Sequence, residues 1–228
     1  EIISFIAASS VCFNCYAVLY KKSIRDSAIW SSEEVSIIWD FYVTKSVATS
    51  ASQQRAAKDF GLKEMPFDTL LDYSGVLAEK REMLMADRID GVLKEYGFVY
   101  MGKDPNTKEV VEIPIEIDSP RLVCMQPYSI TDRNKPVAKG GGKGVTLLTH
   151  MRNSLAHGCT YFFDNGNMLL EDRAAGSSGK TTAMILLPQS SFLDWIKIID
   201  IDGKYYFPNI ARGDYRTLVV RSKPKKHE

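Results

Sequence analysis

Residues 150–158 read HMRNSLAHG, and this segment sets the architecture that the sequence predicts. Read as a helix, it brings His150, Asn153 and His157 to one face, because residues three, four or seven positions apart are neighbours on a helix. A separate apolar stripe is formed by Leu147, Leu148, Met151 and Leu155. Gly158 suits the position just after a helix, so His157 would occupy the last turn, where backbone carbonyl groups favour a protonated imidazole. We therefore expect a helix that docks through one face and carries polar chemistry on another.

The run RNSLAH, residues 152–157, resembles the signature of the HEPN superfamily, in which an arginine and a polar residue are followed by a histidine. In catalytic members the motif forms a metal-independent endoribonuclease site, usually where two copies of the helix meet across a dimer. The resemblance implies that Arg152 binds the scissile phosphate, that Asn153 orients the second copy's histidine or a phosphate oxygen, and that His157 is the general acid or base. Cleavage by the neighbouring 2′-hydroxyl needs such a proton shuttle and a cation for the extra phosphate charge.

The resemblance also implies a fold. We expect a mainly α (α+β) protein, an HEPN-like helical bundle in a single domain over residues 1–228. Two β units, hairpins or meanders, are expected as insertions near residues 98–118 and 160–188.

Local patterns predict the individual elements of this fold. Helices are predicted at residues 31–60, opened by a capping box of Ser31 and Glu34, and at 67–73, 76–96 and 192–199, the last capped by Ser191. Strands are predicted at residues 98–101, 110–117, 160–163, 168–171 and 182–187. The sequence DNGN at residues 164–167 is a strong signal for a tight hairpin turn.

Ribonucleases of this family often serve in toxin–antitoxin or phage-defence systems. The implied partners are therefore RNA, a second copy of the chain in a homodimer, and an antitoxin or other regulatory protein. An alternative of a different class is a non-catalytic HEPN-type module that binds RNA or a nucleotide, or that serves as a dimerisation unit. A third interpretation is purely structural, with Arg152 pairing on a helix surface and His157 stabilising a helix end.

The formal net charge of +1 means that contact with RNA would depend on local basic patches rather than on the field of the whole protein. Lys139 and Lys143 lie in the glycine-rich segment KGGGKG directly before the motif helix and could hold a phosphate backbone near Arg152, although the segment is better interpreted as a plain linker. His150 is a further, weaker candidate for substrate binding. The basic cluster RSKPKK at residues 221–226 is better interpreted as a solvated tail.

No metal and no cofactor is expected. Cys12 and Cys15 form a CxxC pair within an apolar stretch of helical spacing, so we interpret them as buried thiols of a cytoplasmic protein.

Residues 174–181, AAGSSGKT, imitate a phosphate-binding loop, yet alanine replaces the first glycine and a strand is expected to follow. Residues 2–20 carry no charge, but polar residues dilute them and no basic segment precedes them, so we expect a buried helix and no membrane partner.

Overall fold

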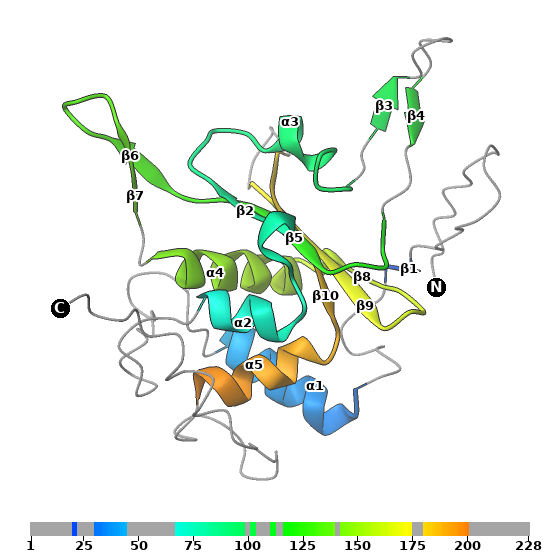
Figure 1. Cartoon of the computed structure of the whole chain (residues 1–228). Helices are drawn as coiled ribbons and strands as arrows, with labels where there is room; N and C mark the ends of the chain where they lie inside the picture. Colours follow the sequence, from blue (N-terminus) through cyan, green and yellow to red (C-terminus); the bar gives the residue numbers. More distant parts are fainter. Residues whose placement is uncertain are drawn as a thin grey trace.

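The computed structural model describes residues 30–44, 67–98, 116–139, 142–174 and 180–200, together with the backbone of short strands at 20–21, 101–103 and 110–112. Its centre is a six-stranded sheet in which every neighbouring pair is antiparallel except the last, which is parallel (Figure 1). In spatial order the strands are β1 (Tyr20–Lys21), β8 (Thr160–Phe162), β9 (Asn167–Arg173), β10 (Thr181–Pro188), β5 (Arg121–Met125) and β2 (Arg81–Leu84).

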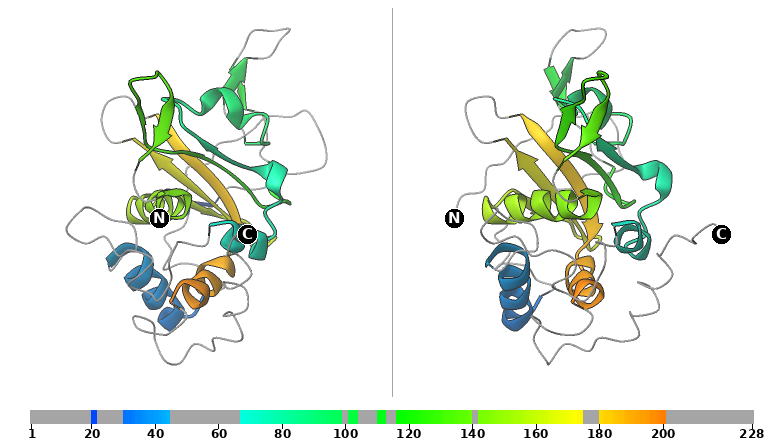
Figure 2. Two further views of the ribbon diagram at one scale, coloured as in Figure 1. Left: turned by 60° about the vertical axis from the view of Figure 1, so that its left-hand side comes forward. Right: turned by 90° about the vertical axis from the view of Figure 1, so that its left-hand side faces the viewer.

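Helices cover one face of this sheet in two tiers. The inner tier is α4 (Gly142–Ala156), which packs on β9 and β10. Beyond it lie α1 (Ser32–Trp39) with the π-helical turn η2 (Asp40–Thr44), α2 (Phe67–Tyr73) and α5 (Ser191–Ile199). Because α4 also contacts η2 and α2, it lies between the sheet and the outer helices (Figure 2). The motif helix is therefore part of the core.

The main core fills the space between the sheet and the helices. Trp195 on α5 is fully buried there, and its Nε1 donates to Ser74 Oγ at 2.7 Å. The buried hydroxyl of Tyr42 donates to the carbonyl oxygen of Phe192 at 2.8 Å. These hydrogen bonds satisfy polar atoms that would otherwise be buried without partners, and they tie α5 to the segment after α2 and to η2.

The expectation of a mainly helical, HEPN-like bundle is wrong. The strands predicted as an insertion near residues 160–188 are the middle of the sheet, and they are buried on both faces. Met168 and Leu170 belong to the main core beneath the helices, whereas Leu169 belongs to a second core on the opposite face. That second core is covered in part by α3 (Asp90–Leu93). Uninterrupted apolar runs such as MLL and AMILL are typical of strands covered on both sides, not of a hairpin with one wet face.

Several local predictions are confirmed. Ser31 and Glu34 form the capping box at the start of α1, with Ser31 N donating to Glu34 Oε2 at 2.8 Å and Glu34 N donating to Ser31 Oγ at 3.2 Å. The helix at residues 67–73 is present, and so is the hairpin of β8 and β9 around Gly166, where φ is +83°. The cap of α5 is not as predicted, because Ser190 precedes the helix and makes no capping hydrogen bond through its side chain.

The predicted long helix at residues 76–96 is also wrong. This segment forms the 3-10 turn η4 (Ala78–Lys80), then strand β2, then the four-residue helix α3. Leu77, expected inward, is exposed, whereas Ile89 and Leu93 are buried in the second core. The parallel pairing of β2 with β5 supplies hydrogen bonds and burial that the helical spacing of the leucines does not reveal.

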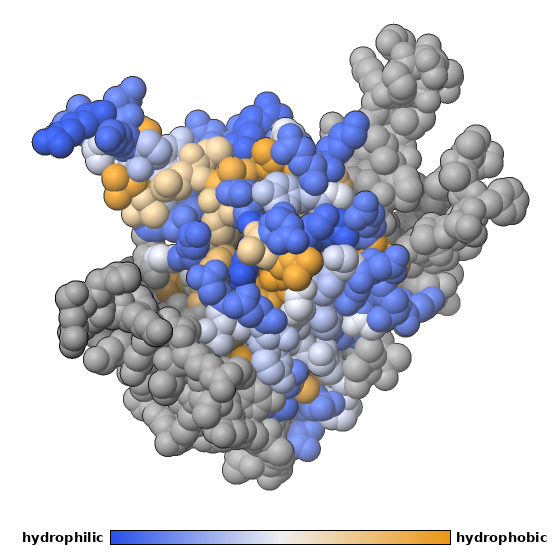
Figure 3. All heavy atoms as spheres, in the orientation of Figure 1, coloured by the Kyte–Doolittle hydropathy of each residue, from blue (hydrophilic) through white to orange (hydrophobic). Residues whose placement is uncertain are grey.

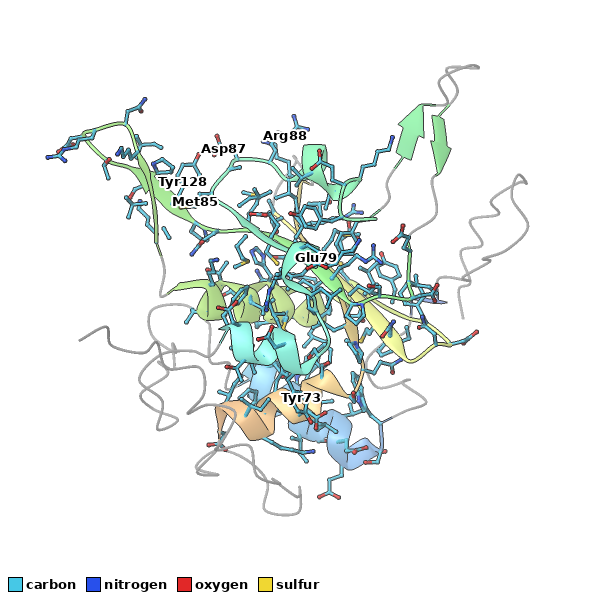
Figure 4. All side chains as sticks on the ribbon, viewed as in Figure 1. Tyr73, Glu79, Met85, Asp87, Arg88 and Tyr128 are labelled. Atoms are coloured by element: carbon cyan, nitrogen blue, oxygen red, sulfur yellow. The ribbon has the colours of Figure 1, made fainter. Side chains whose placement is uncertain are left out.

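Two small hairpins extend from the body. β3 (Met101–Lys103) pairs with β4 (Val110–Glu112), which confirms a hairpin within residues 98–118. β6 (Tyr128–Ile130) pairs with β7 (Pro136–Ala138), and this second hairpin projects from the body with residues 131–139 exposed (Figure 1). Tyr128, whose hydroxyl donates to Asp87 at 3.1 Å, lies with Met85 at its base (Figure 4). Apolar surface gathers where this hairpin joins the body (Figure 3).

The remaining predictions fall outside the described residues. They concern the buried helix at 2–20 with its CxxC pair, the part of the second helix after Thr44, most of the loop at 174–181, and the basic tail at 221–226. Within the described part of the chain, every helix is too short or too polar to cross a bilayer.

Candidate functional site

The motif lies at the C-terminal end of α4, and Gly158 closes that end with φ at +65°. The backbone N–H groups of Gly158 and Cys159 donate to the carbonyl oxygens of Leu155 and Ser154 at 3.1 and 2.8 Å. This pair of hydrogen bonds is the Schellman pattern, which a glycine adopts without the strain that a β-carbon brings. The prediction that the helix ends before Gly158 is confirmed, and His157 is exposed at that end.

A chain of hydrogen bonds joins α4 to β9 and β5. Asp172 Oδ2 accepts from His150 Nδ1 at 2.6 Å and from Asn153 Nδ2 at 3.2 Å. Asn153 Oδ1 accepts from Arg152 Nη1 at 3.0 Å. At the other end, His150 Nε2 donates to the carbonyl oxygen of Met125 at 2.8 Å. We call the side chains of His150, Arg152, Asn153 and Asp172 the α4–β9 network.

The acceptors of this network determine where its hydrogens lie. The carbonyl of Met125 can only accept, so His150 carries a hydrogen at Nε2. The short contact between Nδ1 and Asp172 then requires one more proton between these two groups. With that proton on the ring, the opposite charges of the two groups balance and Asp172 stays a carboxylate. Both ring nitrogens of the buried His150 are therefore occupied, and Asp172 does not cancel the charge of Arg152.

The guanidinium group of Arg152 is held from one side. Its Nη1 donates to Asn153, while its Nε is buried and has no acceptor among the described residues. An unsatisfied buried donor costs about 1–3 kcal/mol. Because Nε itself is enclosed, a ligand such as a phosphate oxygen could meet the guanidinium only at the part of this half-buried side chain that stays exposed.

His157 stands apart from the α4–β9 network. It follows Arg152 by five residues, which places it about 140° further around the helix axis. One copy of α4 therefore does not direct both side chains at one point. Any site that needs an exposed imidazole and the guanidinium together requires either a long substrate or a second copy of the helix.

The structure places both predicted lysines on the surface. Lys139 is exposed at the end of the β6–β7 hairpin, with its backbone N–H donating to the carbonyl oxygen of Pro127 at 2.7 Å. Lys143 is exposed in the first turn of α4, with Nζ 5.7 Å from the centre of the Phe67 ring. Nine residues separate Lys143 from Arg152, or about 14 Å along the helix. The two residues also lie about 180° apart around the helix axis, so α4 does not direct Lys143 and Arg152 to the same side.

Sequence reasoning missed Asp172, the residue on which the network converges. The signal was present, because Asp172 follows the apolar run MLL in β9 and a charged residue inside a buried strand is rare without a partner. Asp172 is buried on the face of β9 that packs against α4, whereas Glu171 on the opposite face pairs with Arg173 at 2.8 Å. What the sequence alone did not supply was the partner, which lies 22 positions away.

Two other reactive side chains on the sheet, Cys124 and Tyr161, have pKa values raised above their ordinary values. Burial raises the pKa of the Cys124 thiol well above its ordinary value, and the nearby Asp172 carboxylate raises it further. Burial and the Glu171 carboxylate likewise raise the pKa of Tyr161. Neither group supplies an anion at neutral pH, and His157 is the exposed imidazole at this end of α4.

No group of three or more His, Cys, Asp or Glu side chains is placed to hold a metal ion in the part of the chain that the structure describes. Comparisons of the chain with family models, with curated proteins and with solved structures found no match.

Proposed function

We propose that the chain is a metal-independent endoribonuclease in which Arg152, Asn153 and His157 have the roles of the HEPN motif. The observation that carries the proposal is the state of Arg152, whose guanidinium is oriented by Asn153, keeps its positive charge and belongs to a partly exposed side chain. A planar guanidinium can grip two phosphate oxygens at once and stabilise the charge that develops during cleavage. The proposal concerns the motif alone, because the scaffold is an α+β fold. Such an activity needs control, so an antitoxin or other regulatory protein in the cytoplasm belongs to the proposal.

The chemistry is an internal transfer of the phosphoryl group. The ribose 2′-oxygen forms a bond to phosphorus while the bond from phosphorus to the 5′-oxygen breaks. One imidazole takes the proton of the 2′-hydroxyl and a second imidazole gives a proton to the departing 5′-oxygen. In a dimer, His157 of each copy would supply one of these two groups, and Arg152 would hold the non-bridging oxygens.

This mechanism makes a prediction about metals and products. Proton transfer and charge stabilisation are both assigned to side chains, so cleavage of a single-stranded RNA should continue unchanged in excess EDTA. The products should be a 2′,3′-cyclic phosphate and a 5′-hydroxyl, which mass spectrometry of the fragments distinguishes from other ends. Activity lost in EDTA and restored by magnesium or zinc would reject the proposal in favour of metal-ion catalysis.

A homodimer is the second part of the proposal, and α4 offers a surface for it. Although most of the helix is buried, Val145, Thr149, Arg152 and Ala156 form a stripe that is partly exposed, at a spacing that keeps them on one face. Three of these four side chains are small, which allows two helices to approach closely. Pairing about a two-fold axis would place both copies of Arg152 at the interface, with His157 of each copy beside it at the end of its helix.

We expect light scattering to show a dimer at micromolar concentration. Ala156→Arg should convert it to a monomer, because each copy would force a long charged side chain into the interface, and should abolish cleavage with it. Ala156 is exposed, so the variant should keep its melting temperature within a few degrees. Glu79→Arg, exposed on η4, serves as the matched control and should remain dimeric. A parent protein that is monomeric and still cleaves RNA would exclude the composite site.

A non-catalytic RNA-binding module is the second candidate, and the β6–β7 hairpin favours it. This projecting hairpin and the residue after it carry Arg133, Lys135 and Lys139, all exposed, against one acidic residue, Asp132. Basic side chains on an exposed arm suit the sequence-independent binding of a phosphate backbone. Tight binding of RNA by a protein that cleaves none would select this candidate.

A further inference from the structure

The network contains one atom that no neutral side chain could replace. Asp172 Oδ2 accepts two hydrogen bonds, from the ring of His150 and from the amide of Asn153. A carboxylate oxygen accepts both without conflict, because it carries no hydrogen. In an asparagine at this position, the amide could take either of two orientations. One presents an oxygen, which leaves His150 without its charged partner. The other presents the NH₂ group, whose hydrogens point at the NH₂ group of Asn153.

The same atom determines the direction of the Asn153 amide. Since Asp172 only accepts, the NH₂ group of Asn153 must face it, and the carbonyl oxygen must face the opposite way. That oxygen receives Nη1 of Arg152. If the amide turned over, Asn153 would present hydrogens to a guanidinium that has only donors, and Arg152 would lose its single hydrogen bond among the described residues.

We propose that Asp172 is the positioning residue of the motif, which orients Arg152 toward a phosphate through Asn153 while His150 keeps Asp172 from neutralising the arginine. The inference rests on the proposed function for the identity of the ligand. It assigns His150 a structural part in the site, as the group that balances the carboxylate, rather than contact with RNA. The buried polar cluster therefore serves to present one uncompensated cation on α4.

The first test measures the orientation of Arg152 directly and needs no RNA. In the parent protein, NMR should show a single sharp Nε–H signal for Arg152, assigned by its loss in Arg152→Lys. Asp172→Asn and Asn153→Ala should broaden or shift this signal. Glu171→Gln is the matched control, since it removes the neighbouring buried acid on the opposite face of β9, and it should leave the signal in place. An unchanged signal in folded Asp172→Asn would overturn the positioning role, whether or not the protein cleaves RNA.

The second test is a double-mutant cycle on the binding of an RNA that cannot be cut, a single-stranded oligonucleotide with 2′-O-methyl groups throughout. Because hydrogen bonds to a charged group are lost, Asp172→Asn and Asn153→Ala should each weaken binding by about tenfold to a hundredfold. If Asp172 acts through Asn153, the double variant should bind no more weakly than either single variant. Additive losses would show that the two residues act separately and would overturn the inference. If the parent binds no RNA, the proposed function fails, and the NMR signal alone decides the positioning role.

Discussion

Replacement of His157 by alanine should lower the rate of RNA cleavage by about 10²–10⁴-fold, the usual effect of removing a positioned proton shuttle. The affinity for RNA should change little, because the proposed contact with the phosphate belongs to Arg152. Initial rates at saturating RNA and the Kd for a 2′-O-methyl oligonucleotide separate these two effects. His157 is exposed and joins no part of the α4–β9 network, so the fold should tolerate the change.

Matched variants make this experiment decisive. His227→Ala removes the remaining histidine outside α4 and should cleave RNA at the parent rate. Arg152→Ala should weaken both binding and cleavage, and Arg152→Lys should not restore them fully, because an ammonium group lacks the planar fork of a guanidinium. Thermal melts of each variant establish that the protein is folded. A folded His157→Ala protein that cuts RNA as fast as the parent would assign the motif a structural role and leave the binding module as the function.

The features that the sequence predicted well are those in which neighbouring residues determine the backbone. Ser31 and Glu34 interact across one helical turn, and Gly166 sits in a turn that only a few residue types adopt without strain. Gly158 ends α4 for the same local reason. In each case the residues that form the hydrogen bonds lie within a few positions of one another, so the pattern and its cause are both visible in the sequence.

The architecture was mispredicted because it depends on pairing between distant segments. β2 acquires its strand conformation by pairing with β5, from Arg81 with Leu122 to Leu84 with Met125. The segment REML shows neither clear alternation nor a breaker, and the leucines around it fit a helical period by coincidence. The motif at residues 152–157 also favoured the wrong fold. These six residues resemble a family signature and so imply a helical bundle, which the rest of the chain does not form.

The candidate site was predicted only in part, because its hydrogen bonds also join segments that are distant in the sequence. The helix and its end before Gly158 follow from local spacing, but the network that holds Arg152 depends on Asp172, which reaches α4 only when β9 packs beneath it. His150 was singled out for its type and its face, and the structure gives it a different position, buried between a carboxylate and a carbonyl oxygen. Residue type singled out the candidate side chains on α4. Tertiary packing determines which of these side chains are buried in the α4–β9 network and which are exposed to solvent.

Substitutions in the main core should lower the free energy of unfolding strongly. Their effects distinguish one continuous α+β core from a helical bundle with a separate β unit. Trp195 on α5 and Leu170 on β9 are both fully buried in the main core. Trp195→Ala should lower the free energy of unfolding by about 3–5 kcal/mol, and Leu170→Ala by about 2–5 kcal/mol. Because one core contains both side chains, each variant should shift the same single unfolding transition in urea, followed by circular dichroism and by tryptophan fluorescence.

Ser74→Ala provides the matched control for Trp195, since it removes only the hydroxyl that accepts from the indole at 2.7 Å. It leaves a buried N–H without a partner and should lower the free energy of unfolding by about 1–3 kcal/mol, less than the loss of the whole ring. Two separate transitions, with Leu170→Ala moving one and Trp195→Ala the other, would contradict a shared core. The strands would then form an independent unit, and the contact between α4 and β9 that orients Arg152 would lose its structural basis.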